Sequence, residues 1–174
     1  VIGSEAFSLK RNKITSVTLP DTVTSIQTKA FYQLNMLLSV NIPASVTFIG
    51  AEAFRSCYKL TSIVIPEGIT EIGAQAFRGC EKLTKVQLPG TLKVIGERAF
   101  MSCFSLAEIS LPEGLKEVGN YAFSGCRALP AVTLPQTLTT IGEDAFQGCE
   151  ALTEVTIPDS VPVMGQGAFD YCVS

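Results

Sequence analysis

The cysteines are the residues of this sequence whose type most readily suggests chemistry, and each lies 23 residues from the next. Zinc sites use closely spaced pairs such as Cys-x-x-Cys, which this spacing does not provide. Side chains in one row point the same way, which disfavours disulfides, although Cα atoms about 5 Å apart would satisfy the distance limit. We therefore expect a row of buried free thiols, with some disulfide as the alternative, and no metal or cofactor. The cysteines are Cys57, Cys80, Cys103, Cys126, Cys149 and Cys172.

The other groups that carry acid–base chemistry are absent or scattered. The sequence has no histidine, which is the commonest general base near neutral pH and the commonest metal ligand. Its one adjacent acidic pair, Glu143–Asp144, is expected on a short helix, where acidic side chains suit the positive end of the helix dipole. Glycines follow the cysteine period instead of clustering into a phosphate-binding loop. The sequence therefore indicates that the protein is not an enzyme.

The cysteine spacing is one sign of a repeat that runs through the chain. An Ala-Phe pair recurs from Ala6-Phe7 to Ala168-Phe169, with a first step of 24 residues and later steps of 23. A proline follows the later period from Pro20 to Pro158. One unit reads Ile-Gly-x-x-Ala-Phe-x-x-Cys-x-x-Leu-x-x-Val-x-Leu-Pro-x-x-Leu-x-x. No linker interrupts it, so we predict that residues 1–174 form a single repeat domain.

Each unit combines two extended pieces and one tight turn. Ile63 and Ile65 alternate with outward residues, which is the pattern of a strand, and Pro66 ends the strand because proline cannot donate to a ladder. A second short extended piece follows at Ile72, and Gly73 is expected to turn the chain sharply at positive φ. The Ala-Phe-x-x-Cys segment has apolar residues at i, i+1 and i+4, which predicts one turn of α- or 3-10 helix.

One unit cannot bury its apolar face alone, so the units must stack. Stacking places each Phe, Leu and Val beside identical neighbours, about 4.8 Å away if the strands pair in parallel. We predict an α/β repeat: a right-handed leucine-rich-repeat solenoid of about seven and a half 23-residue units. A parallel β-sheet would form one side, and short helical or 3-10 turns the other. A parallel β-helix is the structural rival, but its short turns leave no place for the helical segment.

The unit resembles the BspA-like class of leucine-rich repeat. Ala-Phe, Cys and Pro fall in one register, and the resemblance covers essentially the whole chain. It implies a bacterial surface protein of the adhesin type, extracellular or on the cell surface. The implied function is a non-enzymatic module that binds extracellular-matrix, plasma or other surface proteins of a host or microbe. The alternative is a rigid structural spacer that holds other domains off the cell surface.

The first two units depart from the pattern. An extra residue lies in the first unit, near a small basic cluster of Lys10, Arg11 and Lys13. Gln27 and Leu34 stand where later units have Gly and Cys. The sequence also starts and stops inside a unit, from which we expect a segment of a longer surface protein.

Charge is uneven along the chain. Residues 1–100 contain 11 Lys and Arg against 7 acidic residues, whereas residues 101–174 contain 2 against 9. The net charge of −3 gives no general attraction to nucleic acid or to an anionic membrane. No apolar stretch approaches the roughly 18 residues of a membrane helix. We therefore expect no nucleic-acid partner and no direct membrane insertion, and the end-to-end difference would permit head-to-tail association.

The outward side of the main strands is the surface on which we expect protein binding. Alternation places two small, mostly polar side chains of each unit there, and solenoids use such broad surfaces for protein contacts. The predicted residues are Ser39, Asn41, Ser62, Val64, Lys85, Gln87, Glu108, Ser110, Ala131, Thr133, Glu154 and Thr156. A second candidate surface is aromatic: Tyr58 and Phe104 share one variable position, and Phe48 and Tyr121 are further members.

Overall fold

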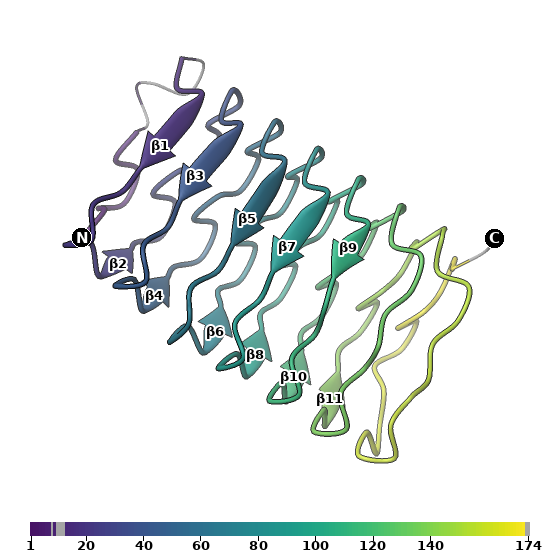
Figure 1. The fold of residues 1–174 in the computed structure, drawn as a ribbon. Coiled ribbons are helices and arrows are strands. Elements are labelled where there is room, and N and C mark those ends of the chain that lie inside the picture. The colour runs from purple at the N-terminus through teal and green to yellow at the C-terminus, as the bar shows by residue number, and fades with distance from the viewer. Residues whose placement is uncertain (8, 10–12, 173–174) are drawn as a thin grey trace.

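The computed structural model describes residues 1–7, 9 and 13–172. It is a right-handed solenoid with parallel sheets and almost no helix, and its two termini lie at opposite ends of the coil (Figure 1). One row of longer strands follows the axis: β1 (Ser16–Thr18), β3 (Ser39–Asn41), β5 (Ser62–Val64), β7 (Lys85–Gln87) and β9 (Glu108–Ile109). A row of shorter strands runs beside it: β2 (Ser25–Ile26), β4 (Phe48–Ile49), β6 (Glu71–Ile72), β8 (Val94–Ile95), β10 (Glu117–Val118) and β11 (Thr140–Ile141).

Strands of neighbouring turns pair in parallel, and the sequence period sets their register. Ser62 pairs with Lys85 and Lys85 with Glu108, so residues at the same position of successive turns lie side by side. We call such a set of equivalent residues a column. The long strands form the ladders β1–β3 and β5–β7–β9, and the short strands form β2–β4 and β6–β8–β10–β11. Each ladder therefore has breaks at defined places.

The core is made of columns of identical or similar apolar side chains. The phenylalanines of the Ala-Phe pairs stack from Phe7 to Phe169, with neighbouring ring centroids 4.8–5.3 Å apart. From Phe31 to Phe146 every ring of this column is fully buried. Leucines, isoleucines and cysteines fill the rest of the interior in the same way. The predicted alignment of the phenylalanines is thus observed, and it gives the coil one continuous apolar interior.

The expected helical or 3-10 turn at Ala-Phe-x-x-Cys is wrong. Ala53 N–H donates to Gly50 C=O at 3.3 Å, as in a tight turn, but Phe54 N–H donates to Ala76 C=O of the next turn at 2.8 Å. The φ angles of Glu52 and Ser56 are 55° and 60°, which interrupts helical geometry. The segment is therefore a run of tight turns that is hydrogen-bonded to the next turn of the coil.

No helix in the described ranges is long and apolar enough to cross a membrane.

The same geometry corrects the expectation for the acidic pair. Asp144 has a φ of 51°, and Glu143 and Asp144 lie in a turn, so they do not begin a short helix. Asp144 occupies the position of Glu52 in its own unit, where the left-handed conformation recurs along the column. The pair is consequently part of the side of the coil formed by the tight turns around the Ala-Phe pairs, which we call the turn side.

The expectation of about seven and a half 23-residue units is not confirmed, because strands do not form in all of them. Within the described residues, long strands form in five turns, ending at β9. Beyond β9 the long-strand row is linked by the single bridge Ala131–Glu154, and Ile141–Met164 is a single bridge in the short row. Val155 is only half-buried there, because a turn near the end of the coil has fewer neighbours to pack against.

The recurring glycine before each turn is required by close approach. Gly73 does not have the positive φ that we expected. Instead, a Cβ at Gly73 would lie 2.9 Å from the backbone nitrogen of Ala51, and one at Gly96 would lie 2.7 Å from the carbonyl oxygen of Ile72. Any larger residue would push neighbouring turns apart, so this column sets how tightly the coil closes.

Candidate protein-binding surfaces

The twelve predicted binding residues all lie exposed along the row of long strands. We call them the long-strand face. Their neighbours in the chain explain the arrangement, because Ile63 and Val86 point inward and are 3% exposed, so the flanking residues must point outward. The structure thus brings the predicted residues together on one continuous surface, and their role in binding stays a prediction.

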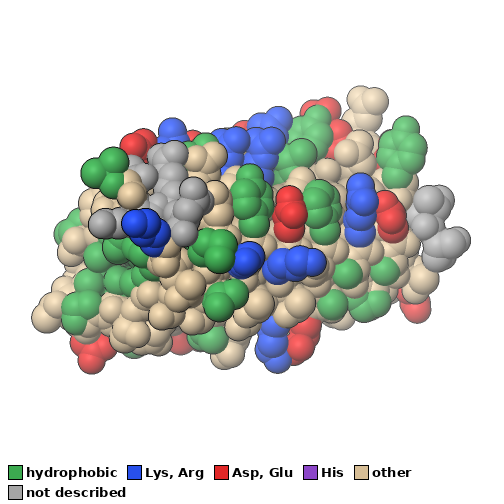
Figure 2. All heavy atoms as spheres, turned by 90° about the horizontal axis from the view of Figure 1, so that it is seen from above, with side chains coloured by type: hydrophobic (Ala, Val, Ile, Leu, Met, Phe, Trp, Pro, Cys, Tyr) green, Lys and Arg blue, Asp and Glu red, His purple; other side chains and the backbone are tan. Residues whose placement is uncertain are grey.

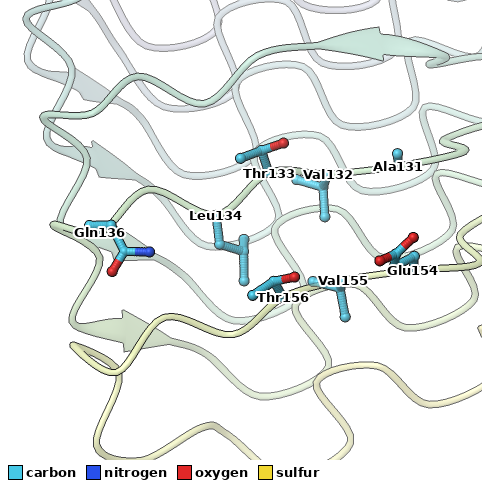
Figure 3. Close-up of a pocket in the computed structure, with 8 residues that line it drawn as sticks. All are labelled: Ala131, Val132, Thr133, Leu134, Gln136, Glu154, Val155 and Thr156. Carbon is cyan, nitrogen blue, oxygen red and sulfur yellow. The ribbon is translucent and has the colours of Figure 1, made fainter.

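Two hollows interrupt this face. One, of about 430 Å³, lies between β7 and β9 beside the ion pair of Lys85 with Glu108. The other, of about 330 Å³, lies between two turns beyond β9 (Figure 3). Its lining residues are Ala131, Val132, Thr133, Leu134, Gln136, Glu154, Val155 and Thr156. The second hollow lies where one bridge replaces the strand ladder, whereas the first lies between two paired strands.

Two of the aromatic candidates, Phe104 and Tyr121, make side-chain contacts within the chain. Phe104 is 37% exposed, and the Arg127 guanidinium lies 5.0 Å from its ring centroid. Arg127 Nε also lies 3.2 Å from Glu150 Oε1. Figure 2 looks onto this edge of the coil, where green, red and blue side chains alternate along the axis. The column therefore alternates in character and is not a continuous aromatic patch.

The other two aromatic candidates differ in their surroundings. Arg98 lies 4.9 Å from the ring centroid of Tyr121, so this ring is also partly covered. Phe48 is 50% exposed and belongs to the short-strand row. Of the expected basic cluster, Lys10 and Arg11 lie outside the described residues, and Lys13 is exposed.

The cysteines form a column of free thiols in the interior. Each thiol donates to the carbonyl of the phenylalanine 26 residues earlier, as Cys80 does to Phe54 at 3.2 Å. Burial raises the pKa of Cys57 and of Cys149 to about 12 and that of Cys103 well above its usual value. A buried thiol that stays protonated is a poor nucleophile and a poor metal ligand. Among the described residues, no group of three or more Cys, Asp or Glu is placed to hold a metal ion.

Sequence reasoning missed a third hollow, of about 450 Å³, on the short-strand row between β4 and β6. Phe48 and Glu71 line it, and Ala51 and Ala74 are among its other lining residues. The sequence holds a signal that could have located it. The position after the recurring glycine is small in the early turns and larger and polar in the later ones: Thr28, Ala51, Ala74, Glu97, Asn120, Glu143 and Gln166.

The fold and its repeat match a known protein family. The profile of the BspA type leucine rich repeat region (6 copies) matches residues 1–103 and 47–174. The chain belongs to this family. A comparison with curated protein sequences gives no match.

Solved structures of bacterial leucine-rich repeat proteins give the same fold. A leucine-rich repeat protein from Bacteroides ovatus is 37% identical, with a TM-score of 0.88 over 94% of this chain and 42% of its own length. The leucine-rich repeat protein of T. pallidum is 35% identical, with a TM-score of 0.85 over 95% of this chain and 80% of its own. A third, from Eubacterium ventriosum, is 26% identical, with a TM-score of 0.78 over 93% of this chain and 44% of its own. The chain thus spans less than half the length of two of these proteins, and their descriptions indicate no catalytic function.

Proposed function

We propose that the chain is a non-enzymatic protein-binding module of a cell-surface or secreted protein, and that it contacts its partner through the long-strand face. The observation that carries the proposal is the exposure of all twelve face residues on one row, with hollows of about 430 and 330 Å³ along it. A broad surface with shallow hollows suits another protein better than a small molecule, which usually needs a deeper pocket.

The charge and polarity of the face also support a protein partner. Lys85, Glu108 and Glu154 are its charged members, and the other residues are small or polar. Lys85 pairs with Glu108, so the face offers hydrogen-bonding groups without a strong field of one sign. Contacts of this kind give specificity through hydrogen bonds and shape. Membership of the BspA-type family supports extracellular-matrix, plasma or other surface proteins of a host or microbe as the partners.

A rigid spacer is the second candidate function, and the phenylalanine column favours it. Interior rings in contact from Phe7 to Phe169 would resist bending of the coil. A spacer would hold neighbouring domains apart, and the residues of the long-strand face would not need to bind a partner. The two functions therefore differ in what a change of that face does.

The test is binding of the protein to a panel of immobilised extracellular-matrix and plasma proteins, measured by surface plasmon resonance. The double variant Lys85→Glu/Glu108→Lys keeps an ion pair on the face while it exchanges the positions of its charges. For a partner found in the panel, we expect its affinity to fall at least about tenfold, since misplaced charges at an interface cost about 1.4 kcal/mol or more.

The matched control exchanges two charges on the short strands, Lys116→Glu/Glu117→Lys, and should leave that affinity unchanged. Both double variants should keep the circular dichroism spectrum and unfolding midpoint of the parent protein. A panel with no binder, or equal affinity for the parent and the long-strand variant, would contradict the binding proposal and favour the spacer.

A further inference from the structure

The hollow between β4 and β6 presents an aromatic ring and a carboxylate on adjacent turns. Phe48 and Glu71 occupy the same column, one turn apart, and both side chains are exposed. Among the described residues, no ion pair engages Glu71, and no lysine or arginine lies over the Phe48 ring. Lys93, on the following turn, extends away, because its Nζ lies beside Gly114. The ring and the carboxylate thus face solvent without a cation of this chain.

The floor of the hollow is open for two reasons. The short-strand ladder is interrupted between β4 and β6, whereas it is continuous from β6 to β11. The residues after Gly50 and Gly73 are Ala51 and Ala74, which are too short to fill the space, while the next turn has Glu97 at this position. The resulting volume of about 450 Å³ lies within the range of ligand sites and exceeds what one long side chain needs.

The molecule itself shows that an arginine can be held between an aromatic ring and a carboxylate of nearby turns. Arg127 lies 5.0 Å from the ring centroid of Phe104 and 3.2 Å from Glu150. On the turn side, Arg55 lies 5.7 Å from the ring centroid of Tyr32, and its Nη1 lies 2.7 Å from Glu52 Oε2. In both places a guanidinium satisfies the face of a ring and an acidic side chain at once.

We infer that the hollow between β4 and β6 binds an arginine side chain of a partner protein. The planar guanidinium would lie on the Phe48 ring and donate two N–H groups to the Glu71 carboxylate, with the arginine stem above Ala51 and Ala74. Arginine fits better than lysine, because its fork matches a carboxylate with two parallel hydrogen bonds and its flat face stacks on an aromatic ring. The site lies on the short strands, so it does not depend on the function proposed for the long-strand face.

The test titrates the ¹⁵N-labelled protein with the capped peptide acetyl-Gly-Arg-Gly-amide and follows backbone amide shifts by NMR. The control peptide replaces arginine with citrulline, which has nearly the same shape but no charge. We expect saturable shifts at Ala51, Glu71 and Ala74 with the arginine peptide, and an affinity at least about tenfold weaker with citrulline. Equal shifts with both peptides, or no shifts with either, would overturn the inference. Glucose or mannose shifting the same amides as strongly would also overturn it, in favour of a sugar site.

The chain provides variants whose folding is supported by its own sequence. Ala74→Gln introduces the neutral residue that Gln166 supplies four turns later, and Glu71→Thr introduces the residue at the equivalent Thr140. Each should abolish the shifts caused by the arginine peptide while leaving the remaining spectrum in place. Ala131→Glu on the long-strand face is the matched control and should not change them. Full binding by Ala74→Gln or by Glu71→Thr would contradict the assignment.

Discussion

The central and terminal turns of the coil are built from the same unit but differ in order. In the centre, the rings of Phe54, Phe77 and Phe100 are fully buried, 5.3 Å apart and within 5° of parallel. At the beginning, Phe7 is only half-buried and tilted by 21° from Phe31. At the other end, the ring of Phe169 lies within 1° of parallel to that of Phe146, but it is half-buried, and single bridges replace strands. The comparison indicates that a unit obtains its burial and strand pairing from neighbours on both sides.

The largest expected difference between centre and end comes from the phenylalanine column. Phe77→Ala should lower the free energy of unfolding by about 3–5 kcal/mol, because it removes a fully buried ring and leaves a cavity. Phe169→Ala should cost about half as much or less, because that ring is already partly in water. Urea unfolding followed by circular dichroism measures both. Equal losses would mean that the end of the coil is packed as tightly as its centre.

A smaller difference is expected from the glycines. Gly96→Ala places a Cβ 2.7 Å from the carbonyl oxygen of Ile72, and the backbone must shift to accommodate it. We expect a loss of about 1–3 kcal/mol in the free energy of unfolding. Gly3→Ala, in the first turn, has no heavy atom within 4 Å of the added carbon and should change stability little. The same urea titration compares the two variants, and a stable Gly96→Ala protein would show that the spacing of the turns is not fixed by this column.

The thiols give the smallest difference at neutral pH, and their effect appears only at alkaline pH. The pKa of Cys57 is about 12 in the folded protein against an ordinary 9.0, so the unfolded chain loses this proton first and stability falls as pH rises from 9 towards 12. Cys57→Ala should therefore reduce that fall by about 1.4 kcal/mol per pH unit.

The matched variant at the end of the coil is Cys172→Ala. The pKa of Cys172 is also raised by burial, but this thiol is less buried, so its removal should change the pH dependence less. Unfolding in urea at half-unit steps from pH 8 to 10.5 gives both slopes. If the two slopes agree with that of the parent protein, thiol burial does not contribute to the alkaline loss.

The sequence predicts well which residues share a column of this fold, and it predicts the backbone conformation of the turns poorly. The stacked Ala-Phe pairs, the parallel pairing and the exposure of Lys85 and Glu108 follow from period and alternation, since equivalent residues must meet equivalent residues. The left-handed conformation of Glu52 does not follow, because the i, i+1, i+4 pattern of a helical turn also suits a run of tight turns bonded to the next unit. Residue preferences do not predict this conformation either, because most residues at the position of Glu52 in other units are not glycine.

The candidate sites divide in the same way. The long-strand face could be predicted because two outward residues flank every inward one. The hollow beside Phe48 could not be predicted from alternation, because it depends on a break between β4 and β6 and on the short side chains of Ala51 and Ala74. Breaks in a ladder reflect small differences in distance between turns, which a repeat pattern treats as identical.

The glycine column has a consequence for how such a protein can change length. From Gly50 to Gly165, each turn meets the one before it through a glycine and a phenylalanine. A duplicated or deleted unit of 23 residues in this range would therefore still meet matching neighbours. The length of the coil would then change in steps of about 4.8 Å, which is the spacing between neighbouring strands. Recombination could therefore change the distance between two surfaces of the coil by a whole number of turns. The packing of the interior would stay the same.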